Sequence, residues 1–375
     1  MAQRMLICAG LARGESTAAP VAESADVTAA ADCLRALGAS VRFENGRAVI
    51  RGTDPARAEG AVLRCGDSAA ALRFFIPLCL LSEREMRLEG SAGLMNRPLA
   101  VYRELFRERG LLFAEENGGV RVKGRLEAGE YELDGAVSSQ FVSGLLFALP
   151  GLPGDSVLRL RPPVESRSYI DMTMAALGAF GVETRWLDRE TIAVPGRQCY
   201  EFRSDVTVEG DWSNAAFFLA LGLDVTGLDP ESLQGDRVCA AHFAALRRGP
   251  AAIDIADCPD LGPVLFAFAA AHRGGVFTGT RRLRMKESDR GAAMAEELRK
   301  FGVTVDVEEN RVTVSGGIKA PTETLSGHND HRVVMALAVL LTRVGGSIAG
   351  AEAVSKSFPD FFARLQDCNI EMEIR

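Results

Sequence analysis

The sequence lacks three features, and each absence excludes a class of protein. No two of its eight cysteines form a CxxC pair, which argues against a thiolate zinc site and favours buried free thiols in a reducing compartment. No apolar run reaches the ~20 residues needed to cross a bilayer. The net charge is −7 without blocks of Lys or Arg, so the sequence lacks the electrostatic footprint of a nucleic-acid binder.

The composition is that of a globular protein with two domains. The 375 residues exceed one typical domain, and 47% hydrophobic with 25% charged residues allow a sizeable core. The apolar stretch at residues 1–11 is too short for a secretion signal and has no positive run before it. We therefore expect a cytoplasmic protein without membrane association, whose first helix is amphipathic and ends near Gly14. In a net-negative chain, any anionic ligand must be met by a local cluster of basic groups.

A pattern of helix, glycine and hairpin recurs along the chain. Glycine suits the left-handed position that ends a helix, and alternating apolar residues form half-buried strands. In the four good copies, the helices end at Gly38, Gly110, Gly181 and Gly302, and the predicted strands are 41–43 with 48–50, 111–113 with 120–122, 182–184 with 191–194, and 303–305 with 312–314. Two poorer copies end at Gly249 and Asn369, and their predicted strands are 252–255 and 370–374.

Six copies at intervals of roughly 50–70 residues indicate a repeat architecture, with three units in each of two domains. The segment that begins at Val206 opens a fresh unit. The predicted domains are therefore residues 1–204 and 205–375.

Charged and hydroxyl residues stand beside several predicted helix starts. Ser138 and Ser139 precede an apolar helix, where they cap it or leave backbone N–H groups for a phosphate. Lys286 and Arg290 lie four apart on a predicted helical turn, and three more arginines precede them in the segment 281–284. Like charges on one helix face repel each other unless an anion neutralises them, which favours an anion site over a solvated charged turn.

A second basic group follows at residues 328–332. Asp330 is a predicted helix cap, and it places His331 and Arg332 in the first turn, where the helix dipole disfavours cations that serve no ligand. His328 and His331 form at best a weak metal site because no third ligand is evident, so no metal is predicted. Arg97 precedes a proline and is expected on an ordered turn.

Together these stretches resemble the 5-enolpyruvylshikimate-3-phosphate synthase family, also called 3-phosphoshikimate 1-carboxyvinyltransferase. The similar stretches follow Gln3 and Arg4 in the family's order: GSAGLMNRP (90–98), VSSQFVSGLL (137–146), ESRSYIDMT (165–173), EGDWSNAAFFLA (209–220), CPDLGPVL (258–265), RLRMKESDR (282–290), SGHNDHRVVMAL (326–337) and SKSFPDFF (355–362). KESDR followed by NDHR in one chain is a specific signal, whereas any single stretch is weak.

The resemblance implies an α/β enolpyruvyl-transferase fold of two domains, each of three βαβαββ units, with the active site in the interdomain cleft. The implied reaction transfers the enolpyruvyl group of phosphoenolpyruvate to the 5-hydroxyl of shikimate-3-phosphate and releases phosphate. It belongs to the shikimate pathway of aromatic amino-acid biosynthesis and uses no metal or cofactor. The implied partners are these two small molecules, with neither nucleic acid nor membrane, and we expect a monomer.

The resemblance also assigns roles to residues of this sequence. Ser138, Ser139 and Ser166 hold the shikimate phosphate with Arg4 and Tyr169 nearby, and Arg97, Gln140, Arg290, Arg332 and Lys356 hold the carboxylate and phosphate of phosphoenolpyruvate. Asp260 takes the proton of the 5-hydroxyl, while Lys286 and Glu287 move protons to and from the methylene carbon and the leaving group. Such a site needs arginines because a guanidinium pairs with carboxylate or phosphate through two hydrogen bonds.

The sequence departs from the family pattern in four places. Members carry a strand and a Lys-Ser pair just before the position of Gln3, and we expect that a start codon placed too far downstream removed them, with a genuine short form as the alternative. Ala69 stands where members have Gly and narrows the space for phosphoenolpyruvate and for the inhibitor glyphosate, unless it is merely a helix start. Arg282 replaces a frequent Asn, and the stretch 211–260 is short.

Three functions remain open from the sequence. A working synthase is favoured by the retained Asp260, Glu287 and Arg332, together with Arg290 and Lys356. A non-catalytic or impaired relative that binds shikimate-3-phosphate is favoured by the missing Lys and by Ala69. The sister enzyme that uses UDP-N-acetylglucosamine is disfavoured because VSSQ and KESDR match the shikimate branch.

Charge pairing gives a first testable prediction. Arg332→Ala and Arg290→Ala each weaken phosphoenolpyruvate binding by more than about 1.5 kcal/mol, the lower end for a hydrogen bond to a charged group. Steady-state kinetics with varied phosphoenolpyruvate measure this loss, and an unchanged KM in both variants would refute the assignment.

Overall fold

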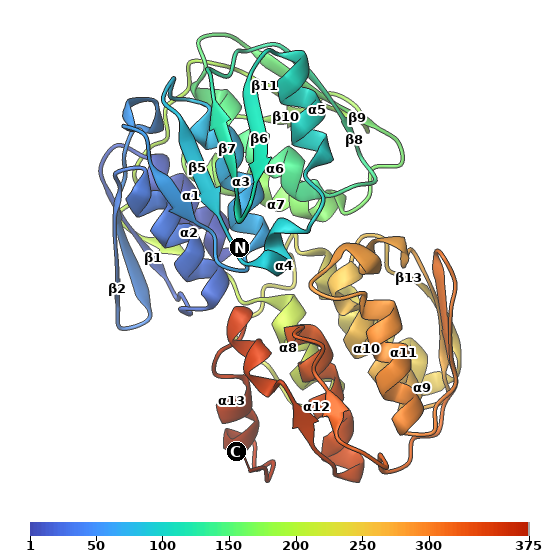
Figure 1. Ribbon diagram of the computed structural model, residues 1–375. Helices are drawn as coiled ribbons and strands as arrows, with labels where there is room; N and C mark the ends of the chain where they lie inside the picture. Colours follow the sequence, from blue (N-terminus) through green and yellow to red (C-terminus); the bar gives the residue numbers. More distant parts are fainter. Residues whose placement is uncertain (374–375) are drawn as a thin grey trace. The chain divides into compact units, whose positions relative to one another are not determined.

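The computed structural model describes residues 1–373 of the chain, which divides into two compact units (Figure 1). The first unit is Met1–Glu209 and the second runs from Gly210 onward, and each encloses its own hydrophobic core. The predicted boundary lay before Val206, but Val206 and Thr207 form a strand that pairs with Ala18 and Ala19 of the first unit. That pairing keeps residues 205–209 with the first unit.

The first unit contains three four-stranded sheets of one design. The strands are β12 (Val206–Thr207), β1 (Glu15–Ala19), β3 (Arg47–Arg51) and β2 (Ser40–Glu44); β4 (Val62–Arg64), β5 (Met86–Glu89), β7 (Gly119–Lys123) and β6 (Leu112–Glu116); and β8 (Glu130–Asp134), β9 (Ser156–Arg161), β11 (Thr191–Val194) and β10 (Arg185–Trp186), in spatial order. Each sheet joins one parallel strand pair to an antiparallel hairpin. The second and third sheets follow the βαβαββ order that the resemblance implied, and the first completes the same design with β12 as its outer strand. The unit thus contains three repeats, as the sequence pattern predicted.

Six long helices accompany these sheets. They are α1 (Ala2–Leu11), α3 (Ala69–Cys79), α6 (Ser139–Ala148), α2 (Ala25–Ala36), α5 (Ala100–Glu108) and α7 (Arg167–Ala179), with the one-turn α4 (Ala92–Met95) before α5. The first three are buried along almost their whole length because most of their residues are apolar. They therefore form the centre of the unit. α1 ends close to the predicted position, but the prediction that it is amphipathic was wrong, because all of its residues from Arg4 to Leu11 are buried.

The second unit contains one further sheet of the same design. Its strands are β13 (Ala251–Asp254), β14 (Gly275–Thr278), β16 (Arg311–Val314) and β15 (Val305–Val307) in spatial order, and a parallel pair is formed by β17 (Leu325–Ser326) and β18 (Ile348–Ala349). Its helices are α8 (Trp212–Ala220), α9 (Cys239–Arg248), α10 (Gly262–Ala270), α11 (Arg290–Lys300), α12 (His331–Val344) and α13 (Phe361–Asp367). None of the helices within residues 1–373 is both long and apolar enough to span a membrane.

Three predicted strands begin later than expected or do not form. The residue after Gly181, Gly302 or Asn369 donates its N–H back to the helix, as Val182 does to Leu177, Val303 to Leu298 and Ile370 to Leu365. The N–H of that residue is not available to a sheet, so a strand can begin only after it. In place of the strand expected at 182–184, β10 begins at Arg185; β15 begins at Val305, and residues 370–373 form no strand; residues 374 and 375 lie outside the described part.

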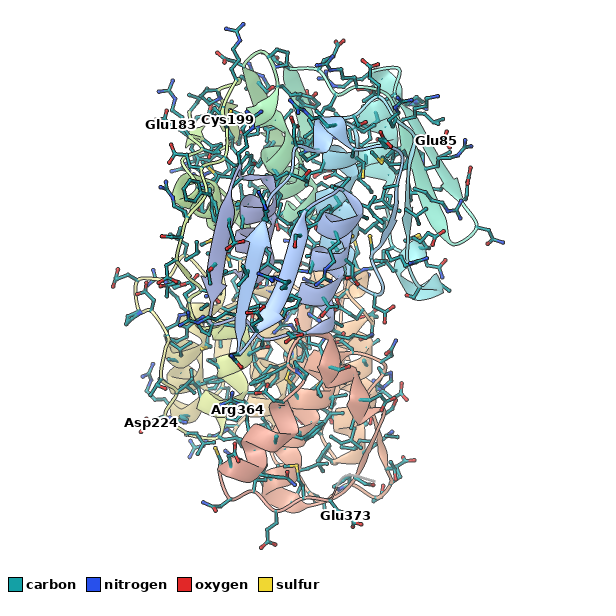
Figure 2. The ribbon with its side chains drawn as sticks, turned by 90° about the vertical axis from the view of Figure 1, so that its left-hand side faces the viewer. Glu85, Glu183, Cys199, Asp224, Arg364 and Glu373 are labelled. Carbon is teal, nitrogen blue, oxygen red and sulfur yellow. The ribbon has the colours of Figure 1, made fainter. Side chains whose placement is uncertain are left out.

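Most of the cysteines lie in the core. All eight cysteines are free, and six of them are buried. Figure 2 shows Cys199, the exposed one, at the surface near Glu183, and Glu85 and Glu373 also point outward. Buried free thiols are what the sequence predicted.

A close approach between α6 and its neighbours requires Gly144. A Cβ atom at this position would overlap the Tyr102 hydroxyl and the Arg73 carbonyl oxygen. The Tyr102 hydroxyl lies 2.9 Å from the carbonyl oxygens of both Arg73 and Phe141, so it cannot move aside without losing a hydrogen bond.

We predict that Gly144→Ala lowers the free energy of unfolding by about 1–3 kcal/mol, the usual cost of overpacking a core. Gly178→Ala is the matched control, because Gly178 also lies in a helix but no atom lies within 4 Å of its added Cβ. That control is expected to be neutral or stabilising by up to ~1 kcal/mol. Chemical denaturation measures both, and equal stabilities of the two variants would contradict the prediction.

Candidate active site

The densest charged network of the second unit surrounds Arg290, the first residue of α11. Its side chain is 1% exposed, and all three guanidinium nitrogens are bonded to carboxylates. Nε lies 2.8 Å from Asp330, NH1 lies 2.7 Å from Asp260, and NH2 lies 2.6 Å from Glu287. One buried cation thus holds three acidic residues from different parts of the chain.

Lys286 reaches the same network from outside a helix. The segment 286–290 was predicted to be a helical turn, but the 3-10 helix η5 (Arg281–Met285) ends before Lys286, whose backbone is extended. The side chain of Asp289 caps α11 by accepting from the Ala292 N–H, so the helix begins only at Arg290. Lys286 and Arg290 nevertheless meet, because both donate to one oxygen of Asp260, Lys286 at 3.0 Å.

Asp260 is surrounded by three cations. It lies in the 3-10 helix η4 (Pro259–Leu261), just before α10, and Arg332 approaches its second oxygen at 3.4 Å. Burial opposes its ionisation, yet Arg332, Lys286 and Arg290 together hold the pKa of Asp260 well below its ordinary value. Asp260 is therefore a carboxylate at neutral pH. It can accept a proton only if the surrounding cations move away from it and its pKa rises.

Asp330 fixes the start of α12 and the residues that follow it. Its Oδ1 accepts from the Arg332 backbone N–H at 3.0 Å, and its side chain is fully buried against Arg290, as predicted for a cap. Burial lowers the pKa of His331 to about 4, so this imidazole is neutral at physiological pH. The buried NH1 of Arg332 and Nδ1 of His331 have no hydrogen-bond partner among residues 1–373.

A buried guanidinium nitrogen without an acceptor costs free energy, which an anionic ligand would recover. Arg332 is thus better suited to receive an anion than Arg290, whose nitrogens are all engaged. Lys356, at the end of the 3-10 helix η6 (Ala351–Lys356), joins the same region by donating to the Asn329 carbonyl oxygen at 2.8 Å.

The structure does not bring the two histidines of this segment to one metal site. His331 groups with Glu287 and Asp330, whereas His328 groups with Glu296 and Glu297. Arg290 already bonds to Glu287 and Asp330 of the first group, and Lys300 already bonds to Glu297 of the second.

In the first unit, predicted residues lie at the N-terminal ends of buried helices. Ser138 caps α6, where its hydroxyl accepts from the Gln140 N–H at 3.4 Å, and Ser139 is the first residue of that helix. Ser166 precedes α7 with a left-handed backbone (φ 54°) and is fully buried. The N–H groups at such helix ends are suited to bind a phosphate.

Arg4 of α1 lies beside Tyr169 of α7. Its NH2 donates to the Tyr169 carbonyl oxygen at 3.2 Å and its Nε to Thr173 at 2.8 Å. Burial lowers its pKa to about 10, so Arg4 remains a cation at neutral pH. The structure therefore brings these two predicted residues together.

Arg73 of α3 joins the predicted residues but was not itself predicted. Its NH1 donates to Gln140 Oε1 at 2.8 Å, and its NH2 donates at 3.2 Å to the carbonyl oxygen of Pro98, the residue after Arg97. Its guanidinium also lies 4.8 Å from the centre of the Phe141 ring. The available signal was a single charged residue inside an otherwise apolar helix.

Asp236 was also missed. It is buried beside the Asp260 network and accepts from the Ser213 hydroxyl at 2.5 Å. Burial and the charge of Asp260 raise its pKa to about 6. Its signal in the sequence was weak, because an isolated acidic residue in a loop is usually solvated.

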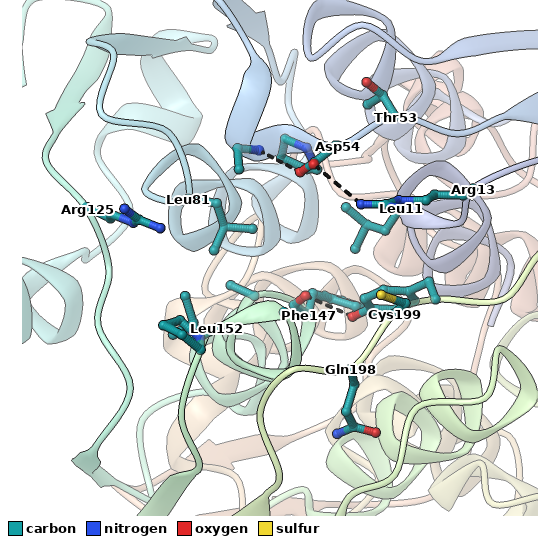
Figure 3. A pocket seen from close by; sticks show the side chains of 16 residues that line it. Leu11, Arg13, Thr53, Asp54, Leu81, Arg125, Phe147, Leu152, Gln198 and Cys199 are labelled. Atoms are coloured by element: carbon teal, nitrogen blue, oxygen red, sulfur yellow. Dashed lines mark hydrogen bonds and ion pairs between the residues drawn. The ribbon is translucent and has the colours of Figure 1, made fainter.

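A pocket of about 220 Å³ in the first unit lies at the opposite, C-terminal ends of α1, α3 and α6. Figure 3 shows its lining, in which Arg13 is directed to Asp54 at 3.9 Å. None of the predicted site residues lines this pocket, so it is separate from the candidate site.

Solved structures with the same fold are enolpyruvyl transferases. An EPSP synthase from Acinetobacter baumannii matches with a TM-score of 0.77 at 22% identity, covering 99% of this chain and 94% of that one. The enolpyruvyl transferase NikO from Streptomyces tendae matches with a TM-score of 0.73 at 14% identity, covering 98% and 92%. The chain thus has the two-domain enolpyruvyl-transferase fold.

The sequence narrows this class to one family. The profile of EPSP synthase (3-phosphoshikimate 1-carboxyvinyltransferase) matches residues 1–248 and 241–365. The chain is 36% identical to the 3-phosphoshikimate 1-carboxyvinyltransferase of Clostridium kluyveri, over 99% of this chain and 93% of the relative, and 34% identical to that of Clostridium acetobutylicum, over 98% and 92%. The chain belongs to the EPSP synthase family.

The neutral, buried His331 predicts a pH-dependent stability. Between its ordinary pKa of 6.5 and its folded pKa of about 4, the unfolded chain binds a proton that the folded chain does not. Stability is therefore lost as the pH falls through this range, by up to about 3 kcal/mol.

His331→Gln removes this contribution, so the variant should lose less stability than the parent between pH 6.5 and pH 4. Urea unfolding at several pH values measures the difference. His242→Gln is the control and should change the pH dependence less, because His242 is only half-buried. Parallel stability curves of His331→Gln and the parent would contradict the prediction.

Proposed function

We propose that this chain is an active 3-phosphoshikimate 1-carboxyvinyltransferase, which transfers the enolpyruvyl group of phosphoenolpyruvate to the 5-hydroxyl of shikimate-3-phosphate and releases phosphate. The observation that carries the proposal is the ionised Asp260, held within 3.4 Å by Arg332, Arg290 and Lys286. A site with one carboxylate among several cations suits a reaction of anionic substrates that needs a base.

In the proposed reaction, Asp260 accepts the proton of the 5-hydroxyl while that oxygen bonds to C2 of phosphoenolpyruvate. A proton from Lys286 or Glu287 reaches C3, which completes a tetrahedral intermediate. C3 then returns a proton, the C2–O bond to phosphate breaks, and the double bond re-forms. An incoming substrate anion would draw Arg332 and Lys286 away from Asp260, which would raise its affinity for the proton.

The remaining roles are proposals from the same resemblance and the same geometry. Ser138, Ser139 and Ser166, with Arg4 and Tyr169, would bind shikimate-3-phosphate; Arg97, Gln140, Arg290, Arg332 and Lys356 would bind phosphoenolpyruvate. The helix-end positions of the three serines and the unpartnered NH1 of Arg332 support these assignments. We further propose that the enzyme is monomeric and cytoplasmic; the eight free thiols support the second of these, because such thiols persist in a reducing compartment.

One observation favours an impaired relative instead. Ala69 begins α3 directly after the Ser68 cap and is 5% exposed, so its methyl group occupies buried space at the end of this helix. If that methyl group blocks phosphoenolpyruvate, the protein binds shikimate-3-phosphate without turnover. Phosphate release with both substrates distinguishes the two functions, and calorimetry with UDP-N-acetylglucosamine tests the sister activity.

Asp260→Asn is predicted to lower kcat by about 10²–10⁴-fold, the usual contribution of a general base. Asp306→Asn is the control, because Asp306 is an exposed carboxylate on β15. Continuous phosphate release measures kcat for both. Turnover by Asp260→Asn within a few fold of the parent would eliminate Asp260 as the base. A parent protein without turnover would eliminate the proposed activity itself.

A further inference from the structure

The segment before α12 makes a turn that most side chains disfavour. The Gly327 carbonyl oxygen accepts from the Asp330 N–H at 2.9 Å, and the two residues between them, His328 and Asn329, have φ angles of 48° and 52°. Both central residues are left-handed, as in type I′ turns, where Asn and Gly prevail. His is less common than Asn or Gly in this conformation, so contacts of its side chain can decide whether the turn is kept.

Glu297 of α11 supplies those contacts. Its side chain is fully buried, its Oε1 lies 2.9 Å from Nε2 of His328, and its Oε2 accepts from the Ser326 N–H at 2.9 Å. Lys300, on the next turn of the helix, neutralises the carboxylate at 3.0 Å. One carboxylate thus holds both the residue before the turn and the first of its two left-handed residues.

The same helix holds the other end of the turn. Arg290 lies seven residues before Glu297, which places the two side chains on one face of α11, two helical turns apart. Arg290 bonds to Asp330, and Glu297 bonds to Ser326 and His328. α11 therefore fixes the segment 326–330 at both ends.

This turn positions residues that the proposed function assigns to phosphoenolpyruvate. The carbonyl oxygen of Asn329 accepts from Nζ of Lys356 at 2.8 Å. Asp330 accepts from the backbone N–H of Arg332 and so sets where α12 begins. If the turn changes its conformation, Lys356 loses its acceptor and Arg332 moves with the start of the helix.

We propose that Glu297 and His328 are positioning residues of enolpyruvyl transfer: their contact keeps the left-handed turn in place, and the turn holds Lys356 and Arg332 where they bind phosphoenolpyruvate. The inference rests on the proposed function. Glu297 and His328 would affect phosphoenolpyruvate binding indirectly and leave shikimate-3-phosphate binding unchanged, because the residues proposed for shikimate-3-phosphate lie in other segments.

His328→Asn separates the contact from the backbone preference. Asn tolerates left-handed angles at least as well as His, but its side chain is too short to place a donor at the position of Nε2. We expect the KM for phosphoenolpyruvate to rise about tenfold or more, while the KM for shikimate-3-phosphate stays within about twofold.

Two further variants serve as rescue and control. His328→Gln restores a donor near the position of Nε2, so its KM for phosphoenolpyruvate should lie closer to the parent value than that of His328→Asn. Lys300→Met removes the other partner of Glu297 but no contact with residues 326–330. It should lower stability while leaving both KM values within about twofold.

Initial-rate kinetics with each substrate varied, together with thermal unfolding of each variant, complete the test. If the KM for phosphoenolpyruvate is unchanged in His328→Asn, the inference is overturned. The proposed function stands in that case as long as the parent protein is active. Equal rises of both KM values in His328→Asn would mean that the contact has only a structural role, and would overturn the inference. A rise of the KM for phosphoenolpyruvate in Lys300→Met as large as that in His328→Asn would overturn it for the same reason. A parent without turnover overturns the proposed function itself, and the inference with it.

Discussion

The burial of Arg290 is the constraint on which the charged part of the second unit depends. Its guanidinium is 1% exposed and bonds to Asp260, Glu287 and Asp330, so removing it would leave three carboxylates close together without their shared cation. A buried ion pair contributes little net stability when intact, but breaking it is costly. The arrangement of every acidic residue in this network therefore depends on one side chain, which is better suited to structure than to ligand exchange. Arg332, with its unpartnered NH1, is the complementary case.

The polar groups of the two units differ in kind. In the first, hydroxyl residues and backbone N–H groups stand at the ends of α6 and α7, and Arg4 and Arg73 contribute buried positive charge. In the second, charged side chains from η4, from the segment after η5, and from α11 and the start of α12 neutralise one another. The first arrangement suits a phosphate whose charge stays constant, and the second suits groups whose charge changes during a reaction.

Features with local causes could be predicted from the sequence, and features with distant partners could not. The caps at Ser138 and Asp330 bond to residues two positions ahead, so a short motif contains both partners. The contact between Arg290 and Asp260 joins residues thirty apart; the family resemblance assigned both to the active site but did not predict that they bond to each other. Arg73 was missed because its partners lie on other segments, and the turn at 286–290 was mistaken for a helix because Asp289 was not recognised as its cap. The strand expected at 182–184 begins only at Arg185, and periodicity does not reveal that the Val182 N–H bonds back to the helix.

The pairing of β1 with β12 has a consequence for biosynthesis. β1 begins at Glu15, but its parallel partner ends at Thr207, and the Val208 N–H then bonds to Ala19. The first sheet therefore remains open at one edge until residues 206–207 have left the ribosome. During that interval α1, which is almost entirely apolar, has no completed sheet to cover it. The nascent chain must stay free of aggregation over this period, because α1 and β1 reach their final surroundings only after β12 has been made.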